Sequence, residues 1–391
     1  MIGIQMEPVD TLFFRDGTPF SAGSASQEDV GGLFPPHPAS VAGALRAALA
    51  RLNGWTGNGR WPQQLNETLG DGPNDLGKIS LTGPFLLRDG QPLFPAPLHL
   101  LGSREAGVWR PRTMLRPGSP VACDLGEVLR LPEMPPDDGG VEVAELKAGD
   151  GWWLTRPGLE AVLRGQIPGP AEVVPSTRSV TNAQGEILDR GLWREERRIG
   201  LERDRSTRTA QEGMLYSTRH VRLLPGVALG VRVSGLPEAW TLPFGQMIAL
   251  GGESRLAECR EWHDDSTIDM PLAAIEASRR MVVVALSPLD LEDAVYLGRQ
   301  PLIALGNARV ISACLSRPQR IGGWESLTRR PLPLRSVLPA GSVLFCELPE
   351  PERLRAAVAT SGELPRIGER QRCGFGMVAL GIWSDKSEVT S

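Results

Sequence analysis

Short apolar runs separated by proline- and glycine-rich turns recur along the whole chain, and this pattern predicts many strands and few helices. The 391 residues include 34 prolines and 45 glycines, which favour turns over long regular elements. A β-branched run at 281–288 predicts a fully buried strand. Further apolar segments predict strands at residues 2–8, 79–87, 93–98, 227–233, 251–262, 337–348 and 377–383.

Two segments carry helix signals instead. Residues 41–52 are rich in Ala and Leu, with Ser40 as a candidate N-cap and Gly54 as a stop. A second helix is predicted between Pro351 and Gly362, since proline favours the first turn and glycine the position after the end. Residues 12–20 predict a strand end and a tight turn at Asp16 and Gly17.

The order of these elements indicates the fold class. Strand, helix, strand and strand occur in the first 100 residues, and a similar series follows residue 280. We expect an α+β protein made of two ferredoxin-like (RRM-type) units with insertions. The N-terminal domain would span 1–279 with an insertion at about 100–200, partly ordered and containing a turn-rich linker at 131–140. The C-terminal domain would span 280–391 and carry a glycine-rich loop.

Residues 194–223 contain eight arginines and no lysine. Arginine pairs bidentately with phosphate and stacks on bases. The second half of this segment alternates with period two, which places Met214, Tyr216, Thr218, His220 and Arg222 on one side of a strand. An arginine- and threonine-rich loop leading into a strand with a polar and aromatic face favours single-stranded RNA. Five acidic residues in the same segment leave a solvated surface as the alternative.

Composition narrows the partners. A formal net charge of −4 and a pI near 5.8 argue against a free-standing duplex-DNA binder, but permit a local basic surface. Pro225 and Gly226 predict a hairpin turn, across which the strand at 227–233 would pair with the preceding arginine-rich strand.

The cysteines are scattered and lack CxxC spacing, so we expect no zinc site and a reducing, cytoplasmic environment. They are Cys123, Cys259, Cys314, Cys346 and Cys373. The sequence also lacks a signal-peptide pattern and a run of about 18 apolar residues that would span a membrane. No cofactor is expected.

The glycine-rich loop at 367–376 has two interpretations. Its glycines would allow close backbone approach to an anionic ligand, or they would form a tight helix-to-strand turn. A nucleotide-binding loop needs a strand before it and a helix after it. Here the predicted order is reversed, which disfavours a nucleotide cofactor.

Catalytic chemistry finds little support in the sequence. His37 and His220 are the candidate general bases for RNA cleavage, yet neither has a second histidine or a carboxylate pair beside it. The sequence offers no carboxylate cluster for two-metal phosphoryl chemistry. We therefore expect no catalytic and no metal-binding residues.

Six segments, in order, resemble one family. They are residues 7–20, 34–46, 197–223, 251–257, 337–345 and 367–381. Together they resemble the third subunit of the type III-B CRISPR Cmr effector complex, a member of the RAMP superfamily. The resemblance spans nearly the whole chain and is weakest between residues 100 and 190.

This resemblance implies a non-catalytic subunit in antiviral defence. Such a subunit is built from ferredoxin-like units and holds the 5′ repeat-derived tag of the CRISPR RNA (crRNA). It docks the large palm-domain subunit and a neighbouring RAMP backbone subunit, and meets target RNA only indirectly.

On that basis each candidate residue has an expected role. Those expected to position phosphates are Arg198, Arg203, Arg205, Arg208 and Thr209. Those expected to stack on or read bases are Tyr216, His220 and Arg222. Those expected against the RNA backbone are Gly374, Phe375 and Gly376, with Arg15 and His37 as lesser candidates.

Two other functions remain open from the sequence. One is a RAMP-type RNA-processing endonuclease with His37 or His220 as general base. The other is a nucleotide-binding metabolic enzyme that uses the glycine-rich loop.

Overall fold

A computed structural model gives the architecture and describes residues 1–15, 29–73, 75–105, 108–122, 129–135, 145–177, 180–181, 187–189, 191–204, 206–264, 267–296, 298–325, 328–361 and 364–383. Strand residues, at 39%, outnumber helical residues, at 18%. The expectation of a mixed α+β protein is therefore confirmed. Among the described residues no helix is long and apolar enough to cross a membrane.

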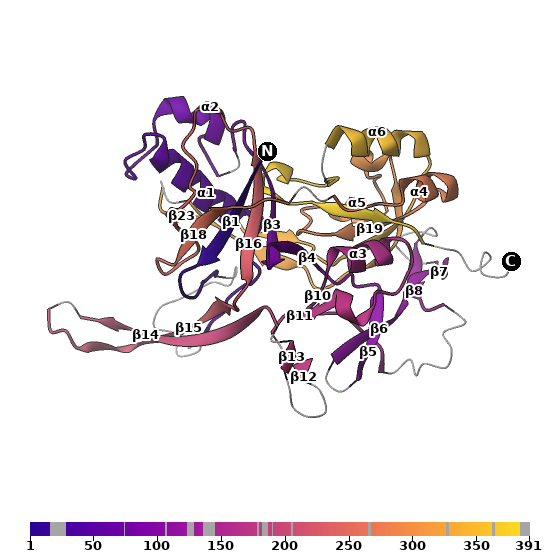
Figure 1. Cartoon of the computed structure of the whole chain (residues 1–391), viewed down its shortest axis with the longest axis horizontal. Coiled ribbons are helices and arrows are strands. Elements are labelled where there is room, and N and C mark those ends of the chain that lie inside the picture. The colour runs from indigo at the N-terminus through magenta and orange to yellow at the C-terminus, as the bar shows by residue number, and fades with distance from the viewer. Residues whose placement is uncertain are drawn as a thin grey trace. The chain divides into compact units, whose positions relative to one another are not determined.

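The chain forms two compact units, each assembled from three separate segments (Figure 1). Unit 1 comprises Met1–Gly90, Leu192–His263 and Arg320–Ser336. Unit 2 comprises Gln91–Gly191, Asp264–Gln319 and Val337–Ser391. The chain therefore passes between the units several times, and neither unit is a continuous stretch of sequence.

Unit 1 is centred on an antiparallel sheet with the strand order β3-β16-β1-β18-β17. These strands are β1 (Ile2–Pro8), β3 (Ser80–Arg88), β16 (Val227–Ser234), β17 (Met247–Ala249) and β18 (Leu256–Glu261). Strand β1 begins and ends as predicted. Strand β16 does not form the predicted hairpin with the preceding strand, because it pairs with β1 and β3 instead.

Helix α1 (Pro38–Leu52) packs against β3 and β17. It starts earlier than predicted, and His37 replaces Ser40 as the N-cap. The reason is Pro38, whose fixed φ suits the first helical position and whose missing N–H costs nothing there. Val41, Leu45 and Leu49 form the buried face of the helix, as the apolar spacing predicts.

Unit 2 contains a four-stranded antiparallel sheet with the order β20-β25-β19-β26. The strands are β19 (Arg280–Ala285), β20 (Arg309–Cys314), β25 (Val343–Glu347) and β26 (Val378–Gly381). The helices of this part are α4 (Leu272–Ser278), α5 (Asp293–Tyr296) and α6 (Pro351–Ser361).

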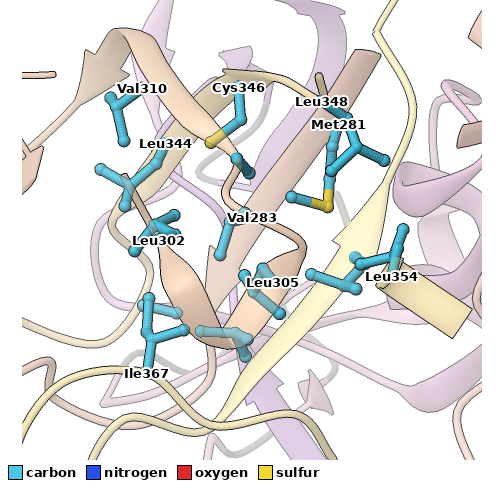
Figure 2. Close-up of a cluster of buried hydrophobic side chains, with 14 of the residues drawn as sticks. Met281, Val283, Leu302, Leu305, Val310, Leu344, Cys346, Leu348, Leu354 and Ile367 are labelled. Atoms are coloured by element: carbon cyan, nitrogen blue, oxygen red, sulfur yellow. The ribbon is translucent and has the colours of Figure 1, made fainter. Parts of the chain in front are cut away.

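The core of unit 2 joins the sheet to these helices and to the glycine-rich loop. Val283 of β19 and Leu344 of β25 project into it together with Leu354 of α6 (Figure 2). Ile367 enters the same cluster from the loop and is 1% exposed. The loop is therefore anchored by a buried apolar side chain.

The segment 91–191 is more ordered than the sequence predicts. Trp109, Leu154 and Leu159 are buried within it, so it has a core and belongs to unit 2. Its strands are β4 (Gln91–Pro95), β5 (Leu100–Glu105), β6 (Val108–Met114), β7 (Arg116–Pro120), β8 (Arg130–Glu133), β9 (Lys147–Ala148), β10 (Trp152–Leu154), β11 (Val173–Pro175), β12 (Val180–Thr181) and β13 (Ile187–Asp189), with helix α3 (Arg156–Leu163). Apart from β4, which overlaps the strand predicted at 93–98, periodicity misses these strands because most of them are short.

Smaller elements lie wholly or mostly in unit 1. They are β2 (Asp29–Val30), α2 (Asn66–Leu69), β21 (Gln319–Ile321), β22 (Trp324–Glu325), β23 (Arg330–Pro331) and β24 (Arg335–Val337). The turn predicted at Asp16 and Gly17 lies outside the described residues.

Candidate nucleic-acid interface

The arginine-rich segment forms a long hairpin, which we call the arm. Strand β14 (Trp193–Arg203) pairs antiparallel with β15 (Ala210–Leu223). Figure 1 shows these strands as a ribbon that extends away from the sheet of unit 1. The first half of the segment is therefore a strand and not the predicted loop. The second half is the predicted strand.

Cross-strand pairs show which side chains share a face of the arm. Tyr216 lies opposite Gly200, and Thr218 lies opposite Arg198. Because directly paired residues point to the same side of a sheet, Arg198 joins the face predicted from the alternation in β15. The Thr218 hydroxyl and His220 Nε2 lie 3.1 Å apart on that face.

An ion-pair cluster ties the root of the arm to the loop after β1. Asp10 Oδ2 accepts from Arg198 Nη2 at 2.7 Å, and Asp10 Oδ1 accepts from Arg222 Nη2 at 2.7 Å. Glu196 accepts from both Nε and Nη2 of Arg222. Arg255 adds a third cation, with Nη1 3.4 Å from Asp10 Oδ2. The cluster holds three arginines and two acids.

These contacts set the charge state of the cluster. Hydrogen bonds from Arg198 and Arg222 hold the pKa of Asp10 well below its usual range, and Arg222 likewise lowers the pKa of Glu196. The same carboxylates raise the pKa of Arg222. Both acids are therefore ionised at neutral pH, and they partly neutralise two arginines that the sequence assigns to RNA.

His220 lies inside the root of the arm and is 0% exposed. Its Nδ1 is 3.1 Å from the Thr11 hydroxyl, and its ring stacks on Phe13 at a centroid distance of 5.1 Å. Burial, with Arg255 and Arg198 nearby, lowers its pKa. The structure thus assigns His220 a packing role in place of the predicted base contact. The ring offers no surface to a substrate either.

The outer half of the arm carries the accessible candidates. Arg203, Arg208 and Thr209 are exposed, and Arg205 lies outside the described residues. The half-buried Tyr216 ring lies across Gly200, where an added Cβ would come within 2.4 Å of the ring. Glycine at 200 therefore leaves room for the aromatic ring on this face.

The turn of the arm is organised by Asp204. Its Oδ1 accepts from the backbone N–H groups of Ser206 at 2.7 Å and Thr207 at 2.9 Å. Hydrogen bonds from Ser206 and Thr207 lower the pKa of Asp204 to about 2. Arg208 follows with a φ of 59°, so the turn holds its backbone in the left-handed region.

The glycine-rich loop is a tight turn whose glycines face protein atoms. Gly376 has a φ of 75°, and a Cβ there would lie 1.9 Å from the Ile367 carbonyl oxygen. Phe375 is 0% exposed beneath the Arg370 guanidinium, at 3.9 Å from the ring centroid. Gly374 is also buried. Phe375 is therefore packed inside the protein, and the close approach at Gly376 favours the tight-turn interpretation of this loop.

The two lesser candidates, Arg15 and His37, differ in accessibility. Arg15 is exposed and forms an isolated bridge with Gly32. His37 is 8% exposed at the start of α1, where its carbonyl oxygen accepts from the Ser40 N–H at 3.0 Å. Arg15 therefore lies at the surface, and the His37 ring is largely enclosed.

Comparison with known proteins identifies the family. A sequence model of the family described as CRISPR-associated protein (Cas_Cmr3) matches residues 4–383. The chain belongs to this family. The resemblance found in the sequence is therefore confirmed. No curated protein matches the chain.

Solved structures similar to this Cas_Cmr3 family member come from CRISPR complexes. A chain of the cryo-EM structure of the Type III-B Cmr-beta bound to cognate target RNA shares 17% identity, with a TM-score of 0.47 over 88% of this chain and 86% of that chain. The Cmr-beta structure with target RNA and AMPPnP gives the same identity and coverage and a TM-score of 0.46. A chain of the Csm3–Csm4 subcomplex of the type III-A interference complex shares 10% identity, with a TM-score of 0.38 over 98% of this chain and 100% of that chain.

Sequence reasoning missed Asp10 and Arg255 as partners of the arm in this family member. Asp10 is 212 residues from Arg222 in the sequence, so no local pattern connects them. A signal was present, because both residues lie in or beside segments that carry the family resemblance.

Proposed function

We propose that this protein is a non-catalytic crRNA-binding subunit of a type III-B Cmr interference complex, in which the arm contacts the 5′ repeat-derived tag. The observation that carries the proposal is the arm itself, which presents exposed arginines beyond an anchored root in a chain of the Cas_Cmr3 family. The subunit would dock the large palm-domain subunit and a neighbouring RAMP backbone subunit, and meet target RNA indirectly.

The chemistry of the outer arm suits single-stranded RNA. Arg203 and Arg208 are exposed, and arginine gives phosphate contacts that are bidentate and charge-assisted. Tyr216 offers an aromatic ring on one face of the ribbon, and single-stranded RNA is commonly held by stacking its bases on such rings. At the root, the third arginine of the Asp10 cluster leaves an excess of one positive charge next to this surface.

Ferredoxin-like organisation of both units is part of the proposal. In unit 2 the strands numbered in chain order lie as second, third, first and fourth, all antiparallel, with helical segments in both crossovers. In unit 1, β3, β16, β1 and β18 repeat that order with α1 in the first crossover. This is the arrangement expected of a split β-α-β fold.

A non-catalytic role is favoured by the surroundings of the two candidate bases. His37 is 8% exposed and His220 is 0% exposed, and a general base must reach the proton it removes. The endonuclease alternative predicts site-specific cleavage of a repeat-containing RNA in EDTA, lost on His37→Ala or His220→Ala. We expect no cleavage by the purified chain.

Binding of a fluorescent tag-containing RNA to the full chain tests the arm. We expect the double variant Arg203→Ala/Arg208→Ala to weaken binding to all tag sequences and to flatten the salt dependence, by about 0.7 in the log–log slope per lost phosphate contact. Tyr216→Ala should cost about 1–3 kcal/mol of binding if a base stacks there. Arg317→Ala, which removes an exposed arginine of unit 2, is the matched control.

An unchanged affinity and salt slope in the double arm variant would contradict the proposed contact.

Membership of a complex is tested separately. Purification of the affinity-tagged protein together with the products of neighbouring genes, followed by sequencing of bound RNA, should recover crRNA. Recovery of the partner subunits without RNA would limit the role to protein docking.

A further inference from the structure

A basic hollow of about 950 Å³ opens at one end of the four-stranded sheet of unit 2. Its charged lining residues are four arginines and one acid, namely Arg279, Arg280, Arg299, Arg309 and Glu347. This local excess of three positive charges contrasts with the net charge of −4 of the whole chain. The hollow therefore has the opposite sign to the average surface.

The acid lies between two of the arginines on adjacent strands. Glu347 of β25 pairs in register with Arg280 of β19 and with Arg309 of β20. Its Oε2 accepts from Arg309 Nη2 at 3.0 Å. The Arg280 guanidinium also lies 5.3 Å from the centroid of the Trp383 ring. These contacts position the arginines of the sheet but supply only one negative charge.

Arg279 enters the hollow from a fixed backbone position after α4. Its φ is 55°, in the left-handed region that favours glycine. The Arg279 N–H donates to the Ile275 carbonyl at 2.8 Å, and its carbonyl accepts from the Leu348 N–H at 2.8 Å. Backbone geometry alone would favour glycine at this position, so an arginine here points to a role for its side chain.

The residues on either side of Arg299 fix the course of the backbone there. Gly298 has a φ of 72°, and a Cβ there would lie 2.3 Å from the Val310 carbonyl oxygen. On the other side, the Leu302 side chain is buried and its N–H donates to the Ala308 carbonyl at 2.8 Å. Within the described parts of the chain, neither Arg279 nor Arg299 forms an ion pair with an acid.

We propose that this hollow binds the phosphodiester backbone of a single-stranded RNA segment, at a site on unit 2 that is additional to the arm on unit 1. Arginine forks match phosphate oxygens bidentately, and Arg279 and Arg299 carry positive charge that is not paired with an acid among the residues that the structure describes. The exposed Pro301 and Pro349 and the Gln300 amide add apolar surface and a hydrogen-bonding group, which suit the apolar face and polar edges of a base. An acidic peptide would match the charge but would not present a planar ring with polar edges to this surface.

Binding of a fluorescent oligouridine, which lacks the tag sequence, tests the site in the full chain. We expect Arg279→Gly/Arg299→Ala to bind about tenfold more weakly, with a salt slope lower by about 1.4, the value for two lost phosphate contacts. Arg279→Gly relieves the left-handed backbone, so the variant should fold at least as well as wild type. Arg317→Ala removes one exposed charge beyond the other end of β20 and should bind normally.

Two results with the double hollow variant would overturn the proposal. One is an unchanged affinity and salt slope in the double hollow variant. The other is retained RNA binding together with loss of a co-purifying protein subunit, which would make the hollow a protein-docking site. Ultraviolet crosslinking of the RNA to peptides around residues 298–301 should persist in the Arg203→Ala/Arg208→Ala arm variant. Persistence separates this site from the arm, and loss of the crosslink there would mean that the hollow has no RNA contact of its own.

Discussion

At the residue scale, the candidate site depends on partners that are far apart in the sequence. The alternation in β15 correctly placed Tyr216 and His220 on one face, because a strand alternates its side chains regardless of its neighbours. It did not distinguish the half-buried Tyr216 from the buried His220. That difference comes from Thr11 and Phe13, which lie more than 200 positions earlier.

The Asp10 cluster predicts a pH-dependent contribution to stability. The folded pKa of Asp10 is lowered by Arg198 and Arg222, so its stabilising effect is present above the ordinary aspartate pKa of about 3.9 and is lost as the pH falls below it. Asp10→Asn should therefore destabilise the protein at neutral pH, by about 1 kcal/mol or less since the cluster is screened by solvent.

Urea denaturation at neutral pH and below about pH 4 measures this effect. The gap between wild type and Asp10→Asn should narrow at the acidic pH. Asp150→Asn, at an exposed turn position of unit 2, is the control and should show no such change. A gap of equal size at both pH values would mean that the ion pairs do not carry the effect.

Gly376 gives a second test at the same scale, because the tight-turn and ligand-cradle interpretations of the loop diverge there. A side chain would meet the Ile367 carbonyl at 1.9 Å and would occupy a left-handed backbone. We expect Gly376→Ala to lower the free energy of unfolding by more than about 2 kcal/mol, measured by chemical denaturation. A variant that folds with wild-type stability but loses RNA binding would support the cradle instead.

At the element scale, prediction succeeded where one segment carries its own pattern. Strand β1 and the buried strand β19 were predicted because continuous or alternating apolar runs are a local signal. Strand β14 was missed because its exposed side chains give no apolar periodicity, and the pairing of β16 was wrong because sheet neighbours are chosen by the whole unit. Most strands of 91–191 were missed because they are too short to show a clear apolar period.

The two ends of the arm should respond differently to the same kind of change. Ile199 in the outer half is 73% exposed, whereas Val221 at the root is 7% exposed and exchanges backbone hydrogen bonds with Leu12 at 2.8 Å. Val221→Ser should cost about 1.5 kcal/mol or more of stability, from lost apolar burial. Ile199→Ser should change the unfolding free energy by less than about 0.5 kcal/mol.

Thermal and urea unfolding of both variants checks this pair. If Ile199→Ser destabilises the isolated chain as much as Val221→Ser does, the outer arm packs on the protein and does not extend away from it. With the expected result, an exposed isoleucine that the fold does not need becomes a further candidate for contact with RNA or a partner subunit.

At the scale of the whole molecule, both sheets repeat one strand order while the chain crosses between units. The sequence suggested two similar series of elements but divided them linearly at residue 280. Membership of a unit depends on contacts between distant segments, and these have no local signature. In unit 2 the Leu98 N–H donates to the Gly341 carbonyl at 2.9 Å, and the Ile382 N–H donates to the Leu163 carbonyl at 2.9 Å.

Hydrogen exchange can decide between the linear division and the discontinuous units. Leu344 is 0% exposed in the core of unit 2, and Leu344→Ala should cost about 2–5 kcal/mol. Destabilising a unit speeds hydrogen exchange at the amides that exchange only when that unit unfolds. If unit 2 unfolds as a whole, exchange should accelerate in residues 145–163 as well as in 280–285 and 343–347, while 2–8 and 227–234 stay protected.

The control is Leu315→Ala, at a side chain that is 38% exposed, which should leave the exchange rates of all these residues unchanged. Acceleration confined to residues beyond 280 would instead support the linear division, because the 91–191 segment would then be stable without the C-terminal sheet.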